Sequence, residues 1–486
     1  MKQYASWLST LSLTVALAAC GTSPNVDEPQ PNAQAPQQTQ GLARQSTGQQ
    51  RPPNPLTPKP NSNRSMYNPG MAGDFERLAE REPGFAGFIL NQDGELHVYT
   101  APAGNQARAE RAAQELALKV QERRNRSQAN AAVTPDLPTM AARTRSYRAQ
   151  YNYRQLSDWR NLLRTQVFDE DTFSMMTVSI PDNAILIGTT EERGWERMRG
   201  IAARLKIPPQ AIKLVVRPRA QSVQLSGTLD NEQSTFVGGL QIYTEGILGC
   251  TLGLNINMYD QFGGSGKGFL TNSHCTTYLA TADYREHFQG PQGSMNVVGY
   301  EHTDPATFGY ETSALCSGGV PCRWSDSAFV LYYSWAAANS PFAIARTTNR
   351  VYSGYGSLSI NTSSPQLRVF NEYGIYLGDP MEKIGQTSGW TYGTAQNVCV
   401  DALPRGAGEF VRLCQIESDM DVFGGDSGSP VFYRTDTNNV EALGLVWGST
   451  MNDAQTVSYA SYSSDLASIR RDFYDYAGYD FQVASY

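Results

Sequence analysis

The pattern of apolar and polar positions divides the chain into four stretches. A short apolar run at Trp7–Ala19 is followed, from Thr22 to about Gly73, by a stretch with very few large apolar residues. From 74 to 225, short apolar runs alternate with segments of helical period, and a fourth stretch runs from Phe236 to the end. We therefore expect an ordered unit between a polar linker and a larger C-terminal domain.

The stretch 74–225 predicts a small α+β unit. Residues 84–100 read as two strands around Asp93-Gly94, which is a strong signal for a hairpin turn. The other expected elements are helices at 108–124, 156–163 and 191–205 and strands at 177–180, 184–188 and 212–216. No motif with chemistry falls here, and His97, which alternates within a strand, is expected to be structural.

The first twenty residues have the features of an export signal. Lys2 precedes the apolar run, which is too short to span a bilayer. The run ends in Leu17-Ala18-Ala19-Cys20-Gly21, which resembles a bacterial lipobox and would place a lipid on Cys20. The alternative is an ordinary secretory signal, since Ala16-Leu17-Ala18 also fits a cleavage site. Both alternatives export the protein.

Residues 21–73 are rich in Pro, Gln, Asn, Ser and Thr. Such a segment cannot offset its ordering entropy by burying apolar surface, so it is expected to be disordered. Behind a lipidated cysteine it would tether the protein to a membrane.

Composition and charge exclude several classes of protein. The 486 residues include 43 Gly, 26 Pro and 26 Tyr, which indicates many turns and half-buried strands. The net charge of −7 argues against a general nucleic-acid binder. Residues 101–220 hold 20 Lys and Arg against 12 Asp and Glu, whereas residues 236–486 hold 12 against 24. These opposite charges indicate either two separately solvated domains or two surfaces that meet.

The cysteines agree with export. Apart from Cys20, six remain, and all lie in the second half of the chain: Cys250, Cys275, Cys316, Cys322, Cys399 and Cys414. Six cysteines allow fifteen pairings, and disulfides persist in oxidising compartments. No C-x-x-C pair or Cys/His cluster has zinc spacing, so we expect no metal site.

One glycine-rich segment carries a candidate nucleophile. In VFGGDSGSPVF, glycines surround Asp426-Ser427, and flanking glycines allow tight turns and close approach of a substrate backbone. The backbone N–H groups of Gly425 and Ser427 can then point at one spot, as an oxyanion hole requires. Alone, such a segment could also be a simple turn.

A histidine and an aspartate supply the remaining chemistry. His274 ends an apolar strand and lies next to Cys275, which could fix it in place. Asp326 begins a strongly apolar run, an unfavourable position for a carboxylate unless it has a partner. Other candidate acids lie in loops: Asp304, Glu311 and Asp379. A triad needs a buried acceptor to orient its imidazole, which favours Asp326.

The order His274, Asp326, Ser427 resembles that of chymotrypsin-like serine proteases, most closely the secreted streptogrisin and α-lytic protease group. The resemblance runs from Phe236 to the C-terminus, and it also includes Phe236–Gly239, Cys250–Gly253, Gly385–Gly389, Val446–Gly448 and a closing helix at Asp465–Phe473. It implies an all-β fold of two six-stranded antiparallel barrels, with the site between them. It also implies that Cys250 pairs with Cys275.

The resemblance assigns further residues. Val446, Trp447 and Gly448 would pair with the substrate backbone, and Lys383 would pair with Asp426. Asp421, six residues before Ser427, occupies a position where trypsins bind basic side chains. It could equally be a solvent-facing residue of an acidic loop. Proximity in sequence suggests the other two disulfides, Cys316–Cys322 and Cys399–Cys414.

The unit at 74–225 resembles the pro-region of these enzymes, and its positive charge fits docking on a negative protease domain at 236–486. Cleavage is expected between about Ser222 and Val237. The chain is thus predicted to be an exported serine endopeptidase made as a pro-enzyme, without cofactor, acting on proteins or peptides at the cell envelope or outside the cell. The alternative is a catalytically silent binding module with a protease fold, tethered at the cell surface.

Overall fold

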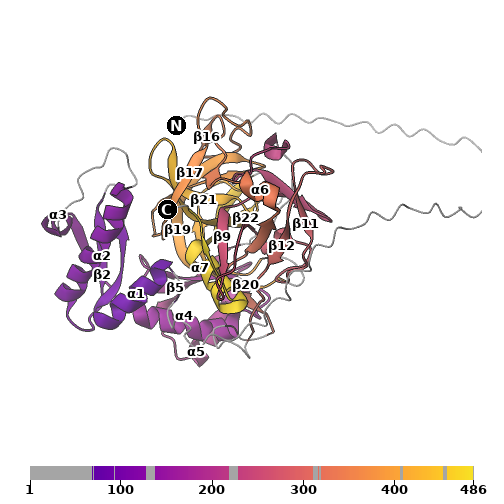
Figure 1. The fold of residues 1–486 in the computed structure, drawn as a ribbon. Helices are drawn as coiled ribbons and strands as arrows, with labels where there is room; N and C mark the ends of the chain where they lie inside the picture. Colours follow the sequence, from indigo (N-terminus) through magenta and orange to yellow (C-terminus); the bar gives the residue numbers. More distant parts are fainter. Residues whose placement is uncertain are drawn as a thin grey trace, which may run out of the picture. The chain divides into compact units, whose positions relative to one another are not determined.

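The structure is a computed structural model, and it describes residues 68, 70–91, 94–126, 137–217, 228–309, 316, 319–404, 409–452 and 457–484. The predicted signal, the lipid on Cys20 and nearly all of the predicted linker lie outside the described residues. We call residues 68–217 the N-terminal segment and residues 228–484 the C-terminal half (Figure 1). No helix among the described residues is long and apolar enough to cross a membrane.

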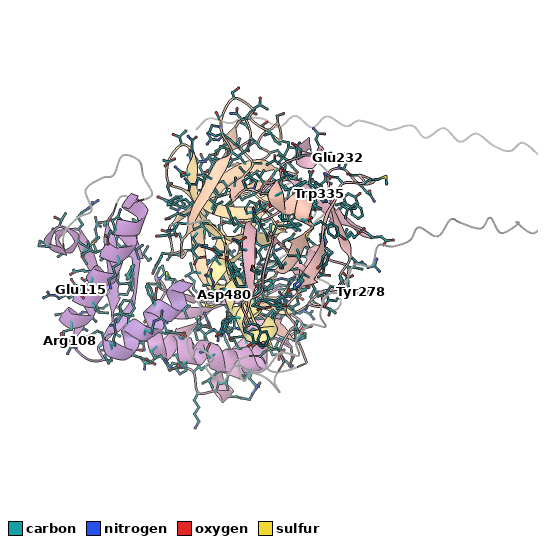
Figure 2. The ribbon with its side chains drawn as sticks, in the orientation of Figure 1. Arg108, Glu115, Glu232, Tyr278, Trp335 and Asp480 are labelled. Carbon is teal, nitrogen blue, oxygen red and sulfur yellow. A yellow bond between two sulfur atoms is a disulfide. The ribbon has the colours of Figure 1, made fainter. Side chains whose placement is uncertain are left out.

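The N-terminal segment begins with a three-stranded sheet. Its strands are β1 (Phe85–Leu90), β2 (Leu96–Thr100) and β3 (Thr144–Arg148), in the order β1-β2-β3. The helices α1 (Gly70–Arg81), α2 (Gln106–Arg126) and α3 (Leu137–Ala142) accompany this sheet, and Arg108 and Glu115 are carried by α2 (Figure 2). β1 and β2 pair antiparallel, which confirms the predicted hairpin.

The remainder of the N-terminal segment alternates helix and strand as predicted. Its elements are α4 (Tyr153–Val167), β4 (Phe173–Ser179), β5 (Ala184–Thr189), α5 (Gly194–Arg204) and β6 (Ile212–Val216). A capping box at Asn152 and Gln155 starts α4. One boundary differs from expectation: α1 begins at Gly70, inside the stretch expected to be linker, because Met71 and Phe75 bury apolar surface in the core.

An eight-stranded sheet forms the first part of the C-terminal half, with the order β24-β9-β10-β14-β12-β11-β7-β8. Its strands are β7 (Gln241–Thr244), β8 (Ile247–Thr251), β9 (Asn255–Asp260), β10 (Ser265–Thr271), β11 (Glu286–Gln289), β12 (Val297–Thr303), β14 (Ala328–Tyr332) and β24 (Tyr479–Gln482). All these pairings are antiparallel. The C-terminal strand β24 was not predicted from the sequence.

A ring of antiparallel pairings forms the second part. The pairings run from β18 through β19, β20, β23, β22 and β21 and back to β18. The strands are β18 (Pro380–Gly385), β19 (Gly389–Ala402), β20 (Val411–Ser418), β21 (Pro430–Arg434), β22 (Asn439–Met451) and β23 (Ser458–Asp465). Short strands β13 (Cys322–Arg323), β15 (Ala343–Ile344), β16 (Arg350–Val351) and β17 (Leu367–Glu372) join the same sheet, and α6 (Ser334–Ala338) and α7 (Leu466–Asp472) complete the half.

The N-terminal segment extends this second sheet. β4 pairs antiparallel with β19, so that β4, β5 and β6 continue the sheet beyond the ring. The hydroxyl of Thr177 donates to the carbonyl of Val398 at 3.0 Å, and the N–H of Leu403 donates to the carbonyl of Ser174 at 3.2 Å. The two parts of the chain therefore share a backbone ladder as well as side-chain contacts.

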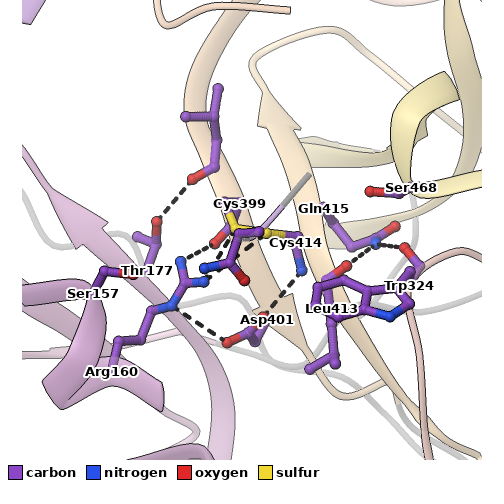
Figure 3. The surroundings of a disulfide bond; sticks show 12 residues. Ser157, Arg160, Thr177, Trp324, Cys399, Asp401, Leu413, Cys414, Gln415 and Ser468 are labelled. Atoms are coloured by element: carbon purple, nitrogen blue, oxygen red, sulfur yellow. Dashed lines mark hydrogen bonds and ion pairs between the residues drawn. A yellow bond between two sulfur atoms is a disulfide. The ribbon is translucent and has the colours of Figure 1, made fainter. Parts of the chain in front are cut away.

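Two buried arginines of α4, Arg160 and Arg164, reach the hairpin formed by β19 and β20. Figure 3 shows Arg160 beside Cys399 and Asp401. Arg164 donates from Nε and Nη2 to the two carboxylate oxygens of Asp401, each at 2.7 Å. Arg160 donates to the carbonyl of Cys399 at 3.0 Å and lies 3.2 Å from its sulfur. Burial and then the neighbouring Arg164 lower the pKa of Arg160, while Asp401 partly raises it. Paired, hydrogen-bonded charges of this kind are the form in which charge is tolerated in an interior.

The residues that precede Phe236 pack with the C-terminal half. Leu229 is fully buried in the core beneath the first sheet. Glu232, labelled in Figure 2, accepts a hydrogen bond from the hydroxyl of Ser294 at 2.5 Å, and the N–H of Gln233 donates to Gln289 at 2.7 Å. The C-terminal half therefore includes Thr228–Thr235, eight residues more than the domain expected from Phe236.

Three disulfides are present, and all three expected pairings are confirmed: Cys250–Cys275, Cys316–Cys322 and Cys399–Cys414. The first joins β8 to the turn that carries His274. The third ties β19 to β20 at the hairpin that the N-terminal segment contacts.

A buried histidine makes the stability of the fold sensitive to acid. His287 on β11 is 1% exposed, and burial lowers its pKa to about 4, partly offset by the backbone of Arg285. Because an unfolded histidine titrates near 6.5, the unfolded chain binds more protons between these values, and stability falls as the pH drops from about 6.5 to 4.

We expect His287→Met to remove about 3 kcal/mol of the loss in unfolding free energy between pH 7 and pH 4. Urea unfolding at both pH values measures it. His97→Met, in the N-terminal segment, should keep the full loss, and an equal loss in His287→Met would contradict the assignment.

Candidate active site

His274 lies in a short turn, η3 (Ser273–Cys275), that directly follows β10. Its ring Nδ1 is 2.8 Å from Oδ2 of Asp326, and its backbone N–H donates to Oδ1 of the same residue at 3.2 Å. The disulfide from Cys275 to Cys250 anchors the turn to β8. The other ring nitrogen, Nε2, is buried and has no hydrogen-bond partner among the described residues.

Asp326 precedes β14 and is fully buried. Its carbonyl accepts from the side-chain amide of Asn272 at 2.6 Å, and its N–H donates to the hydroxyl of Ser464 at 3.0 Å. Oδ2 also accepts from Nε of Arg412 at 2.8 Å and from Nη2 of the same guanidinium. Burial alone would raise the pKa of Asp326, but Arg412 and then His274 outweigh it and hold that pKa well below its usual range. These two partners therefore favour the charged form of the buried carboxylate.

The loop that carries Ser427 is shaped by glycines in the left-handed region. Gly425 has φ of 92° and Gly428 has φ of 87°, conformations that side-chain-bearing residues rarely adopt. A Cβ on Gly428 would also lie 2.3 Å from the carbonyl oxygen of Thr251. These positions require glycine, as the sequence motif indicated.

The loop is bonded to the strand that carries Cys250. The N–H of Thr251 donates to the carbonyl of Ser427 at 2.8 Å, and the Thr251 hydroxyl donates to the carbonyl of Gly425 at 2.8 Å. The sulfur of Cys275 lies 3.9 Å from the same Ser427 carbonyl. The structure thus brings the backbone of Ser427 against the residue that follows His274. The N–H groups of Gly425 and Ser427 have no backbone acceptor within the described part of the chain.

Asp426 holds the loop from beneath. Its fully buried carboxylate accepts from Nζ of Lys383 at 2.9 Å, from the N–H of Ser388 at 3.0 Å and from the N–H of Phe423 at 3.0 Å. Burial lowers the pKa of Lys383, and Asp426 partly restores it. The predicted contact between Lys383 and Asp426 is therefore confirmed.

The residues predicted to bind substrate backbone, Val446–Gly448, are buried and are already paired within the sheet. Val446 already uses its N–H and carbonyl, which bond to Ser429 and Gly428. Trp447 is fully buried, and its indole N–H donates to Gln415 at 2.9 Å. Gly448 pairs with Tyr462 in the ladder between β22 and β23.

Trp447 belongs to an apolar cluster that the N-terminal segment helps to form. Met175 and Leu186 are buried members of the cluster, and Val215 packs against it. Side chains from β4, β5 and β6 thus pack with Trp447, one of the residues expected to bind substrate backbone.

Asp421 turns towards a neighbouring loop. Its Oδ2 accepts from the N–H of Gly354 at 2.5 Å, and the hydroxyl of Tyr352 donates to nearby Asp419 at 3.1 Å. Tyr355 of the same loop stacks on Phe423 with ring centroids 4.3 Å apart. The acidic residues before Ser427 therefore hold this loop in place.

One group of potential metal ligands comes together among the described residues: Cys250, His274 and Cys275. The two sulfurs are joined in a disulfide, and His274 contacts Asp326, so the group offers no thiolates to an ion. Nothing in this arrangement is suited to holding a metal.

Sequence reasoning missed Arg412 as a site residue. It is 1% exposed, on strand β20, whose residues are all buried although half of them are polar or charged. A charged residue at the start of an apolar run was the signal that identified Asp326, but Arg412 stands in a mixed polar and apolar sequence, VRLCQIES, and carried no such signal.

The structure does not bring the other candidate acids onto the His274 ring. Asp304 lies nearby, where it accepts from the hydroxyl of Ser273 at 2.7 Å and pairs with Arg323. Asp379 caps the N–H of Tyr376, and Glu311 lies outside the described residues.

Comparison with family models and with curated proteins finds no match. Among solved structures, the chain is similar to Nocardiopsis protease (NAPase), with 16% identity and a TM-score of 0.33 over 51% of this chain and 98% of that one. It is similar to Thermobifida fusca protease A, with 17% identity and a TM-score of 0.32 over 51% and 100%. It is also similar to Cellulomonas bogoriensis chymotrypsin, with 16% identity and a TM-score of 0.32 over 51% and 98%.

The contact between Lys383 and Asp426 is open to a direct test. Lys383→Met would leave a buried carboxylate without its cation, so we expect a loss of about 3–5 kcal/mol in unfolding free energy. Lys267→Met is the matched control: Lys267 is partly exposed over Phe342 and should cost less than about 1 kcal/mol. Urea unfolding of the full chain measures both. Adding Asp426→Asn to Lys383→Met should recover part of the loss, and no recovery would contradict the pairing.

Proposed function

We propose that this chain is the precursor of an exported serine endopeptidase that uses Ser427, His274 and Asp326. The observation that carries the proposal is the 2.8 Å contact from His274 Nδ1 to the buried carboxylate of Asp326. The opposite ring nitrogen, Nε2, is buried and has no hydrogen-bond partner in the part of the chain that the structure describes. The backbone of Ser427 is bonded beside the same turn. A protease domain of two antiparallel six-stranded barrels is part of this proposal.

The chemistry follows from the roles of these groups. Ser427 Oγ attacks the substrate carbonyl carbon while His274 Nε2 takes its proton, and Asp326 orients and stabilises the resulting imidazolium. The N–H groups of Gly425 and Ser427 donate to the oxyanion of the tetrahedral intermediate. The imidazolium then protonates the leaving amine, and water hydrolyses the acyl-enzyme by the same steps in reverse. No cofactor takes part.

The N-terminal segment would act as a pro-region that keeps the enzyme silent until it is removed. Its ladder between β4 and β19 supports firm docking, and its side chains in the cluster around Trp447 support this role because Trp447 is one of the residues expected to bind substrate backbone. Its opposite charge also favours docking. The three disulfides support maturation in an oxidising compartment, and a lipid on Cys20 would retain the product at the envelope.

The specificity of the site is a separate proposal. To bind a basic side chain of the substrate, the carboxylate of Asp421 would have to be free to face that side chain. Since that carboxylate already accepts from Gly354, we favour its role in holding the loop over a role in binding a basic side chain.

The alternative is a silent binding module with a protease fold at the cell surface. The observation that favours it is the same docking: the bidentate pair of Arg164 and Asp401 is fully buried, and a segment that never leaves would keep the site covered. The two experiments below separate the alternatives.

An activity-based phosphonate should label processed protein on Ser427. We expect complete labelling of the processed wild type, none of Ser427→Ala, and wild-type labelling of Ser363→Ala, which alters an exposed serine. Mass spectrometry of the labelled peptide reads out the site. Persistent lack of labelling in processed wild-type protein would favour the binding module.

The position of the new N-terminus tests the maturation step. Because Leu229, Glu232 and Gln233 are built into the C-terminal half, we expect cleavage before Thr228. Cleavage at Phe236 would also place a new ammonium on a fully buried residue whose N–H now donates to Asn339, which is unfavourable. N-terminal sequencing of secreted protein gives the position. An intact Ser427→Ala chain would support self-processing, whereas normal cleavage of that variant would exclude it.

A further inference from the structure

Arg412 makes an unusual contact with the candidate triad. It lies on β20, 86 residues along the chain from Asp326, and Nε and Nη2 both bond to the same carboxylate oxygen, Oδ2. Nη1 bonds instead to Glu409 at 3.0 Å. The guanidinium lies over Phe410 and Trp447, 4.4 and 4.7 Å from the ring centroids, so it is held rigidly.

The oxygen that Arg412 occupies is also the oxygen that His274 uses. Oδ2 receives Nδ1 of His274 at 2.8 Å and Nε of Arg412 at 2.8 Å, while Oδ1 receives the backbone N–H of His274. A permanent cation on this oxygen reduces the negative charge that an imidazolium would feel. Arginine is suited to this, since it stays protonated at every working pH.

The other charges around Asp326 are already paired. Arg323 on β13 interacts with it only at longer range, because its own contacts are Asp304 at 2.6 Å and Asp472 at 3.4 Å. Asp304 interacts with Asp326 as a like charge, and its Oδ2 accepts from the hydroxyl of Ser273, next to His274. Among the described residues, His274 and Arg412 are the basic side chains in direct contact with the carboxylate, and Glu409 is the acid next to Arg412.

We propose that Arg412 is a positioning residue that acts on His274 through Asp326 and keeps the imidazole available as a base in mildly acidic solution. The inference rests on the proposed peptidase function and deepens it. A purely structural Arg412 would affect folding or the overall rate. If Arg412 instead competes with His274 for the carboxylate of Asp326, it sets the pH at which the imidazole gains its proton.

The test is the pH profile of peptide hydrolysis by processed enzyme obtained from full chains. Arg412→Met removes the charge but keeps much of the volume, and the midpoint of the acid limb should move up by about one pH unit. Arg412→Lys keeps a charge and should stay closer to the wild type than Arg412→Met. Arg434→Met is the matched control, since Arg434 is a partly buried arginine paired with Glu382, away from the triad, and it should leave the midpoint unchanged.

A second variant moves the midpoint in the opposite direction. Glu409→Gln removes the acid next to Arg412 without touching Asp326, so the midpoint should fall by a few tenths of a pH unit. If Arg412→Met does not fold, the midpoint measured for Glu409→Gln alone tests the proposal. An unchanged midpoint in whichever of the two variants folds overturns the proposal.

An NMR titration tests the role of Arg412 independently of enzymatic activity. In full-length Ser427→Ala, the imidazole signal of His274 is followed against pH with and without Arg412→Met. In this titration the signals of His287 and His302 are distinguished from that of His274, because burial lowers the pKa of both residues. A wild type without activity would defeat the peptidase proposal, while the NMR midpoint, with the same expected upward shift, would still support or overturn the role of Arg412.

Discussion

The carboxylate of Asp326 is the interaction on which the site depends. It is fully buried, and a buried charge persists only if several partners satisfy it. The partners come from both sheets of the C-terminal half: His274 follows β10 of the first, and Arg412 lies on β20 of the second. The geometry around His274 therefore exists only when both sheets have assembled, and the carboxylate joins them.

The same arrangement recurs through the molecule. Asp426 is paired with Lys383 next to the Ser427 loop. Asp401 of the C-terminal half is paired with Arg164 of the N-terminal segment. Arg323 links Asp304 to Asp472, which in turn accepts the N–H and hydroxyl of Ser325 beside Asp326. Removing one member of such a pair leaves an unpaired buried charge, so each pair disfavours any packing in which its partners do not meet.

The sequence predicted what local patterns encode. The hairpin of β1 and β2, the alternation from α4 to β6 and the turn glycines around Ser427 follow from periodicity and backbone geometry, and the disulfides follow from short spacings or from the family pattern. Asp326 was found because a carboxylate in an apolar run is costly. Its partner Arg412 was not found, because it stands in the mixed polar and apolar sequence VRLCQIES and because pairing across 86 positions leaves no periodic trace.

Two other features also depend on tertiary structure. The contact of α4 with the hairpin joins residues more than 200 positions apart, which no local pattern specifies. Asp421 could not be assigned because its partner, Gly354, donates through a backbone N–H, a group that every residue except proline carries. The burial of Trp447 could not be predicted either, since some of the side chains around it come from the N-terminal segment, more than 200 positions away.

The contact between Arg164 and Asp401 bears on how a docked segment could leave. The pair is fully buried, but separation would return both charges to water, and hydration largely replaces the lost attraction. Asp401 would also keep the N–H of Cys414, which donates at 3.0 Å. The net attraction that resists release would then come mainly from the ladder of β4 on β19 and from the apolar cluster, while the charges set the register. A segment held in this way docks in one orientation, and once cut it can leave without stranding a charge in the interior.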